Sequence, residues 1–366
     1  MGMGLYIHVP FCRGKCPYCD FYSVSPDEGT VDRYVSRTLE LMARCSGNCA
    51  QEVGTVYFGG GTPSVIGAGR LGELLEGVNR HFRLSPGAEV SCEVNPTGVS
   101  GEFFSQLYSA GFNRLSMGMQ SANTDELSLL GRRHGPDEVR RAVEAARAAG
   151  FSNISLDLML ALPGSTRESL ERSISFAAEL SPEHISAYIL KVEPGTPFAS
   201  RRLVLPDDDE TAGQYLFAVE RLSELGYLQY EISNFSKPGF ESRHNLCYWR
   251  CDEYLGLGPA AHSFYEGRRF YWGRDLEGYL RGDGPVDDGP GGAPGEFAML
   301  NLRLSRGLIE NECVRRFGEG GRELFSKIRG RVLGCPGSLV EVRPDRVRFT
   351  PEGFLVSNAL LSRLLD

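Results

Sequence analysis

Short apolar runs alternate with helical segments over the first half of the chain, and this alternation limits the possible folds more than any other feature. Runs rich in β-branched and aromatic residues occur at 5–9, 53–58, 89–94, 114–119, 154–159 and 184–190. Segments with helical spacing lie between several of them, at 31–43, 71–82, 137–149 and 168–180. Runs of this kind are typical of strands, and their alternation with helices predicts six strand–helix units around a parallel sheet.

Units of this kind form either an open, doubly wound sheet or a curved partial barrel, and the pattern alone does not distinguish the two. Polar or glycine residues fall at or near the ends of four predicted strands, namely residues 59–62, Glu93, Gln120 and Asp157. Barrel enzymes gather their sites at the rim formed by these strand ends. We therefore predict an α/β fold with a partial (β/α)6 barrel over residues 1–235.

The rest of the chain divides into three predicted segments. Residues 236–281 are aromatic and predicted to be rich in loops, whereas residues 282–295 are dense in Gly, Pro and Asp and predict a linker or mobile lid. Residues 296–366 contain amphipathic stretches, a short strand and a turn. They predict a small C-terminal α+β domain that follows the linker.

The composition is that of an ordinary folded protein, with 41% hydrophobic residues among 366. The formal net charge of −8 argues against a surface built mainly to bind nucleic acid. The N-terminal residues lack the basic and apolar stretches of a secretory signal, and no run of about 18 apolar residues occurs. We therefore expect a cytoplasmic protein without a transmembrane segment.

Three of the ten cysteines, Cys12, Cys16 and Cys19, are crowded into one loop directly after the first predicted strand. In a reducing compartment this clustering indicates a metal centre rather than a disulfide framework. Thiolates are the usual ligands of iron–sulfur clusters, and Gly14 and Pro17 allow the loop to bend around one 4Fe-4S cluster. Three ligands leave one iron open, and S-adenosylmethionine (SAM) could chelate that iron through its amino and carboxylate groups.

The alternative is a structural zinc site with His8 or a remote cysteine as fourth ligand. The position of the loop after the first strand favours the cluster. Together, the cysteine spacing, the aromatic Tyr18 before the last cysteine and the preceding strand resemble the radical SAM superfamily. The resemblance implies that Tyr18 lies against the adenine of SAM and that Tyr6 lies near the cluster and SAM.

The same resemblance extends to the ends of later strands. Consecutive glycines after the second predicted strand leave backbone groups open to a ligand, although a tight turn would use the same residues. The resemblance implies that Gly60, Gly61 and Thr62 contact the methionyl amine of SAM. Four further polar residues could be ordinary rim or surface residues, but they resemble SAM-binding positions of the superfamily: Glu93, Gln120, Arg132 and Asp157.

Segments at 6–12, 58–63, 114–121 and 256–258 resemble the oxygen-independent coproporphyrinogen III oxidase family over nearly the whole chain. True oxidases of that family carry a fourth cysteine two residues after the third, where this chain has Phe21. They also have an N-terminal extension before the cysteine loop, whereas this chain reaches Cys12 almost at once. Both differences count against oxidase activity.

The motif His244-Asn245-x-x-Tyr248-Trp249 instead resembles the HemW-type heme chaperones within this family. An imidazole is a good axial ligand for heme iron, and Tyr248 and Trp249 offer flat surfaces for a porphyrin. The resemblance makes His244 the leading heme-ligand candidate. A hydrogen-bonded structural histidine is the alternative reading, and His262, Cys247 and Cys251 are further candidates for the ligand.

These observations lead to one functional hypothesis and two alternatives. The leading hypothesis is a heme chaperone that holds a 4Fe-4S cluster with exchangeable SAM and passes heme to an acceptor protein, for which the resemblance suggests a respiratory heme protein. The first alternative is oxidative decarboxylation of coproporphyrinogen III. The second is radical SAM modification of RNA, which would need a basic groove or an RNA-binding domain that the sequence does not display. We assign no catalytic residue.

Overall fold

The computed structural model of the chain describes residues 2–47 and 51–365. The first half supplies the strands β1 (Met3–Val9), β2 (Val53–Gly60), β3 (Leu84–Val94), β4 (Arg114–Gln120), β5 (Ile154–Leu160) and β6 (His184–Ile189). The helices that accompany them are α1 (Glu28–Ser46), α2 (Ala68–His81), α3 (Gly101–Ala110), α4 (Thr124–Leu129), α5 (Pro136–Ala148), α6 (Arg167–Glu179) and α7 (Asp208–Glu224).

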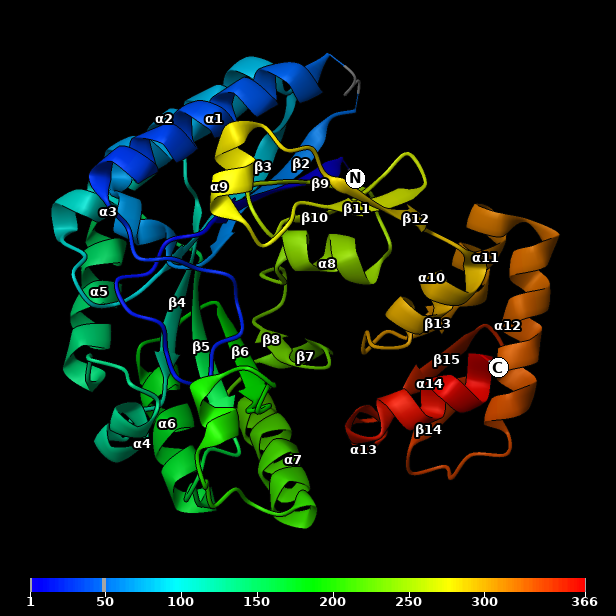
Figure 1. Cartoon of the computed structure of the whole chain (residues 1–366). Helices are drawn as coiled ribbons and strands as arrows, with labels where there is room; N and C mark the ends of the chain where they lie inside the picture. Colours follow the sequence, from blue (N-terminus) through cyan, green and yellow to red (C-terminus); the bar gives the residue numbers. More distant parts are fainter. Residues whose placement is uncertain (1, 48–50, 366) are drawn as a thin grey trace.

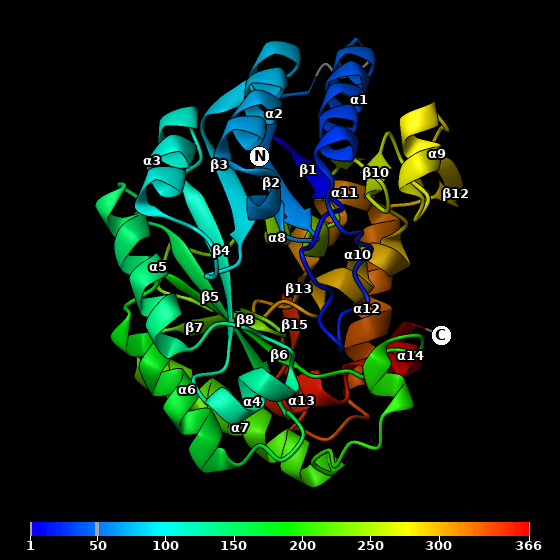
Figure 2. The ribbon, with the colours of Figure 1, turned by 60° about the vertical axis from the view of Figure 1, so that its left-hand side comes forward.

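The strands β1 to β6 lie side by side in chain order, and each is parallel to the next. The sheet curves, and the long helices cover its outer side (Figures 1 and 2). This arrangement confirms the predicted partial barrel. It also brings the carboxyl ends of all these strands to one rim, where the loop that carries Cys12, Cys16 and Cys19 follows β1.

Side chains alternate along each of these strands between an apolar and a polar side. In β4, Leu115, Met117 and Met119 are fully buried in the core shared with the helices, whereas Arg114 and Ser116 face the opposite, concave side. Each apolar side chain of this size contributes roughly 1.5–3 kcal/mol when it is buried. The helices therefore fix the register of the strands, and the polar residues are left to line the interior of the barrel.

The chain after α7 extends the sheet at both edges, through β7 (Leu228–Glu231), β8 (Asn234–Ser236), β9 (Tyr254–Leu257), β10 (His262–Tyr265), β11 (Arg268–Tyr271) and β12 (Val286–Pro290). Within the described residues, the sheet has the strand order β12-β11-β10-β9-β1-β2-β3-β4-β5-β6-β8-β7. Strand β9 is parallel to β1, and the strands from β9 to β12 pair antiparallel with one another.

This extension adds regular structure to two segments that the sequence predicts to be irregular. The loop-rich residues 236–281 also contain α8 (Arg243–Trp249), α9 (Leu276–Arg281) and three strands. Within residues 282–295, β12 pairs with β11, and a role of this segment as a linker or lid stays a prediction. The added strands are short, and their stability comes from pairing with distant parts of the chain that local residue patterns do not reveal.

The C-terminal part contains α10 (Pro294–Asn301), β13 (Leu308–Ile309), α11 (Glu310–Phe317), α12 (Glu319–Val332), β14 (Val340–Arg343), β15 (Arg346–Phe349), α13 (Pro351–Leu355) and α14 (Ser357–Leu365). Its three strands form a small antiparallel sheet in the order β13-β15-β14, within the part of the chain described. This mixture of helices and strands agrees with the predicted α+β character. Among the described helices, none has the length and apolar character needed to cross a membrane.

Gly60 closes the end of β2 against β1 in a backbone conformation that disfavours other residues, with φ +106°. A Cβ at this position would lie 2.4 Å from the His8 ring. We predict that Gly60→Ala lowers the free energy of unfolding by about 2–4 kcal/mol, through backbone strain and overpacking. Urea denaturation followed by circular dichroism would measure the change.

Gly213→Ala is the matched control, because Gly213 is exposed within α7 and its added Cβ would have no neighbour within 4 Å. This variant should gain about 0.5–1 kcal/mol, since alanine favours the helix. Equal stabilities of the two variants would contradict the account of Gly60.

Candidate functional site

The cysteine loop is closed at its base by backbone pairing. Phe11 forms a parallel bridge with Val24, and the Cys12 N–H donates to the Val24 carbonyl at 3.0 Å. Near the tip, the Cys19 N–H donates to the Cys16 carbonyl at 3.1 Å. All three cysteines are half-buried and free of disulfides. Burial raises the pKa of Cys19, and the neighbouring Cys16 and Cys12 thiols add to this rise, so the three sulfurs lie in one electrostatic neighbourhood.

Two predicted SAM residues contact the thiols directly. The Cys12 Sγ lies 3.2 Å from the Thr62 Oγ1, just after β2. The Arg132 Nη1 donates to the Cys16 Sγ at 3.7 Å, while its Nη2 donates to the Gly118 carbonyl at 2.8 Å. The Nε of Arg132 is buried without a hydrogen-bond partner in the described chain. Buried donors normally have a partner, so this free N–H beside the thiols indicates a place where a ligand with an anionic or acceptor group could bind.

The donor set fits a cluster better than a single zinc ion. His8, the proposed fourth zinc ligand, has both ring nitrogens engaged, with Nδ1 at 3.0 Å from the Tyr6 hydroxyl and Nε2 at 3.0 Å from the Tyr22 carbonyl. No three His, Cys, Asp or Glu side chains of the described residues are gathered as ligands of one metal ion. A cuboidal cluster takes each thiolate on a separate iron, so three sulfurs spaced along one loop suit it.

The glycines after β2 pack against β1 and the cysteine loop. The Gly61 N–H donates to the Val9 carbonyl at 2.9 Å, and the Thr62 N–H donates to the Phe11 carbonyl at 2.8 Å. A Cβ on Gly61 would lie 2.7 Å from the Phe11 carbonyl oxygen. The glycines are therefore required to seat the loop on the sheet. Contact of Gly60 and Gly61 with SAM stays a prediction.

Two predicted carboxylates line the interior near the rim. Glu93 accepts hydrogen bonds from the Tyr57 hydroxyl at 2.9 Å and from the Gly60 N–H at 3.2 Å. Asp157 accepts one from the Ser116 hydroxyl at 3.1 Å. Burial raises the pKa of Glu93 to about 7 and that of Asp157 to about 6. Both groups can therefore exchange protons near neutral pH, which is a common property of binding sites.

Gln120 and Tyr18 complete the predicted SAM set. Gln120 ends β4 with φ +67°, and its amide lies with the Arg132 guanidinium over Gly118. The Tyr18 ring packs against Phe198 with ring centroids 6.2 Å apart, and its pKa is raised by burial and by the adjacent Cys16. The fold thus brings Tyr18 and Arg132 to the Cys16 thiol and places Gln120 beside Arg132.

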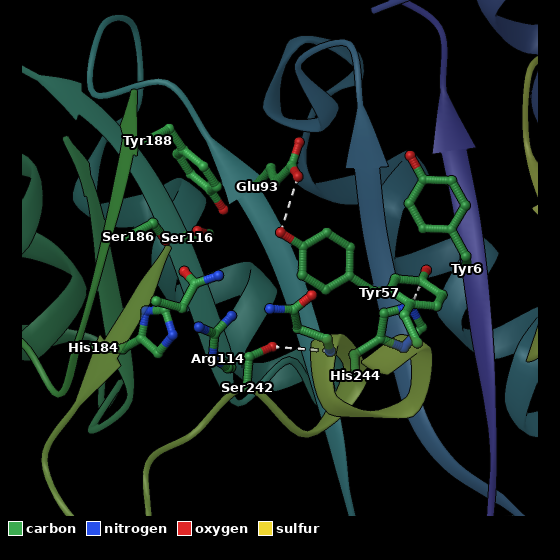
Figure 3. A pocket seen from close by; sticks show the side chains of 13 residues that line it. Tyr6, Tyr57, Glu93, Arg114, Ser116, His184, Ser186, Tyr188, Ser242 and His244 are labelled. Atoms are coloured by element: carbon green, nitrogen blue, oxygen red, sulfur yellow. Dashed lines mark hydrogen bonds between the residues drawn. The ribbon is translucent and has the colours of Figure 1, made fainter. Parts of the chain in front are cut away.

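Below the rim, two cavities lie in the described part of the molecule. The polar cavity, of about 250 Å³, is lined by Tyr6, Tyr57, Glu93, Arg114, Ser116, His184, Ser186, Tyr188, Asn234, Ser242, His244, Asn245 and Tyr248 (Figure 3). The aromatic cavity, of about 450 Å³, is lined by Tyr6, His8, Phe21, Tyr22, Tyr248, Tyr254, Ala260, His262, Tyr271, Trp272 and Arg274. Tyr6 and Tyr248 belong to both walls.

His244, the leading heme-ligand candidate, is 1% exposed and already fully bonded. Its Nδ1 lies 2.8 Å from the Thr55 hydroxyl, and its Nε2 lies 2.7 Å from the Tyr248 hydroxyl. Burial lowers its pKa to about 3, so the ring is neutral. In this arrangement His244 ties α8 to β2, and a bond to iron would require it to give up one of these partners.

Tyr248 and Trp249, the two aromatic residues of the motif, lie in different surroundings. Tyr248 lines both cavities, whereas Trp249 is among the lining residues of neither. The Trp249 ring lies 5.9 Å from the Arg303 guanidinium, on the side of the C-terminal part.

The N-terminus of α8 is held by Glu89, which accepts hydrogen bonds from the backbone N–H groups of Arg243 and His244 at 3.1 and 3.0 Å.

Sequence reasoning concentrated on strand ends and missed polar residues deeper in the barrel, namely Arg114, His184, Ser186 and Tyr188. A signal for them is present in the sequence. Each alternates with apolar residues along its strand, as in Arg114-Leu115-Ser116-Met117. A polar residue at every second position of a strand that is otherwise buried indicates a lined interior rather than solvent.

Comparisons with known proteins agree with this geometry. Residues 6–177 match the family model of the Radical SAM superfamily. The chain is 38% identical to the heme chaperone HemW of Mycobacterium tuberculosis H37Rv, with 99% of this chain and 94% of that protein covered. It is 39% identical to HemW of Escherichia coli K12, with 99% and 98% covered. The structure of coproporphyrinogen III oxidase (HemN) from Escherichia coli has a TM-score of 0.84 at 21% identity, over 99% of this chain and 90% of that chain, which shows a common fold.

The raised pKa of Glu93 predicts a pH dependence of stability. Its carboxyl titrates near 4.5 when unfolded and near 7 when folded, so the folded state holds the proton more tightly. The free energy of unfolding should therefore fall by up to about 3 kcal/mol as pH rises through this window. Glu93→Gln keeps one of the two acceptor oxygens and should remove the part of the fall that Glu93 causes, while the raised pKa of Asp157 leaves a fall of its own.

Urea unfolding at pH 5, 6, 7 and 8, without added SAM, would measure the effect. If the free energy of unfolding changes with pH in the same way in the unaltered protein and in Glu93→Gln, the pKa of Glu93 is not raised by folding.

Proposed function

The chain belongs to the HemW family of the radical SAM superfamily, and on this premise we propose that it binds heme and passes it to an acceptor protein. One observation carries the proposal. An aromatic cavity of about 450 Å³ lies directly beside the cysteine loop, and Phe21 and Tyr22 of that loop form part of its wall. Flat aromatic side chains with polar edges suit a porphyrin ring.

We propose that Cys12, Cys16 and Cys19 hold a 4Fe-4S cluster, which would offer an open iron for SAM. Exchangeable SAM would lie against residues gathered at the rim: Tyr6, Tyr18, Gly60, Gly61, Thr62, Glu93, Gln120, Arg132 and Asp157. The contacts of Thr62 and Arg132 with the thiols support this assignment. So does the unsatisfied Nε of Arg132.

For the heme iron, the geometry supports His262 over His244. His262 lines the aromatic cavity, is exposed, and has no hydrogen bond to its ring nitrogens from any described residue. Its ring stacks on Tyr271 with centroids 5.2 Å apart and planes at 24°, which limits its orientations. His244 would first have to release Thr55 or Tyr248. We therefore propose His262 as axial ligand, with Tyr248 as a wall of the site.

The position of Phe21 bears on the alternative oxidase activity. Where the oxidases have a fourth cysteine, this chain has a side chain that is 66% exposed and lines the aromatic cavity. We propose that Phe21 covers a bound porphyrin rather than serving the cluster. Transfer to the acceptor, for which a respiratory heme protein is our candidate, would take place in the cytoplasm.

The cluster assignment predicts selective loss of iron. Cys16→Ser should abolish the visible absorption of the reconstituted cluster and reduce bound iron and sulfide severalfold, because a serine hydroxyl does not replace a thiolate ligand. Cys335→Ser is the matched control, since Cys335 is also half-buried and free but lies in the C-terminal part. Full cluster content in Cys16→Ser would exclude this residue as a ligand.

The heme assignment predicts different behaviour of two histidine variants. In anaerobic hemin titrations of the cluster-reconstituted protein, His262→Ala should weaken binding at least roughly tenfold and shift the Soret band, because an axial ligand is lost. His244→Ala should lower the melting temperature, since it removes the buried ring that bonds both Thr55 and Tyr248. It should keep the Soret position of the unaltered protein.

The reverse result, with the Soret shift in His244→Ala alone, would return the ligand role to His244. If the unaltered protein forms no saturable heme complex, the chaperone proposal fails, and coproporphyrinogen turnover becomes the next assay.

A further inference from the structure

Arg114 is a buried cation without a counter-ion in contact. It begins β4, is 2% exposed, and lines the polar cavity (Figure 3). No hydrogen bond or ion pair joins its guanidinium to any described residue, and its Nε is buried without a partner. Buried arginines are nearly always paired, because an unpaired charge in the interior is destabilising by several kcal/mol. A contact with an anion is therefore open at this guanidinium.

No carboxylate of the described residues contacts the guanidinium, although the charge of Arg114 lowers the pKa of both Glu93 and Asp157 from a distance and so offsets part of their rise. Glu93 and Asp157 already accept hydrogen bonds from Tyr57 and Ser116, and burial raises the pKa of both carboxyls. His184 is engaged through both ring nitrogens, by Ser155 and Tyr230. The remaining wall consists of neutral hydroxyl, amide and phenol groups. Such a wall can hydrogen-bond a polar ligand, but within the described residues it places no carboxylate in contact with the guanidinium.

A carboxylate is the ligand chemistry that fits Arg114, because the planar guanidinium binds a carboxylate through two parallel hydrogen bonds. Two candidate ligands of this protein carry carboxylates, namely heme and SAM. The arrangement of the cavities favours heme. The polar and aromatic cavities share Tyr6 and Tyr248, so an aromatic compartment adjoins a compartment with a buried cation. Heme has the same two-part character, with a flat apolar ring and two propionates.

We propose that Arg114 binds a heme propionate that reaches from the aromatic cavity into the polar cavity. This inference rests on the proposed heme binding and names the group that fixes the porphyrin in its orientation. The ring lies among the aromatic side chains, and the propionate passes the shared wall of Tyr6 and Tyr248. Binding is thereby selective for porphyrins with a free carboxylate.

The test compares hemin with hemin dimethyl ester in anaerobic titrations of the cluster-reconstituted protein. The unaltered protein should bind hemin roughly tenfold to a hundredfold more tightly than the ester, as expected for a hydrogen bond to a charged group. Arg114→Gln should lose this preference, and Arg114→Lys should recover part of it. Arg346→Gln is the control, because its Nε is likewise buried without a partner but lies in β15 of the small sheet.

Three other results overturn the proposal and separate it from the chaperone function. Saturable hemin binding with no preference over the ester leaves the chaperone function standing but removes the propionate contact; this comparison needs no variant, so it decides even if Arg114→Gln does not fold. Weakened SAM binding with unchanged hemin binding in Arg114→Gln assigns the carboxylate to SAM. Absence of a hemin complex in the unaltered protein removes the chaperone function itself.

Discussion

The strict alternation of side chains in the parallel strands is the constraint on which the rest of the structure depends. Apolar residues such as Leu115 and Met117 bind the sheet to its helices, and this leaves every second position facing the interior. A slip of one residue would place the apolar set inside and the polar set against the helices. The same packing energy that folds the barrel therefore positions Glu93, Arg114 and Asp157 in a common interior.

The barrel and its rim could be predicted from the sequence, because both depend on local residue patterns. Each long strand carries its own apolar run, and the cysteine loop carries its own spacing. The strands β9 to β12 were not predictable in this way. A segment such as Val286–Pro290 contains two aspartates, a glycine and a proline, and it becomes a strand only because β11 offers it a pairing edge. Contacts of this kind are set by the tertiary fold.

The two histidines illustrate a related limit for the site. The sequence motif makes His244 the leading candidate for the heme ligand and His262 a further one, but whether a ring nitrogen is free to bind iron depends on partners far away in the chain. Thr55, 189 residues from His244, takes up one of its ring nitrogens. His262 stacks on Tyr271 and keeps its nitrogens free of bonds to the described residues. The histidine of the motif thus serves the docking of α8 on β2 in this structure.

The loop that carries the thiols also builds the proposed heme site, and this joins the two functions physically. Phe21 and Tyr22 follow Cys19 within three residues and line the aromatic cavity. The Tyr22 carbonyl lies 3.0 Å from His8 Nε2, and its hydroxyl accepts from the Leu276 N–H at 2.8 Å. The Asp20–Arg274 ion pair is mostly exposed and adds at most about 1 kcal/mol. The buried anchor at His8 is therefore the main link, and an ordered cluster loop would hold one wall of the heme cavity in place.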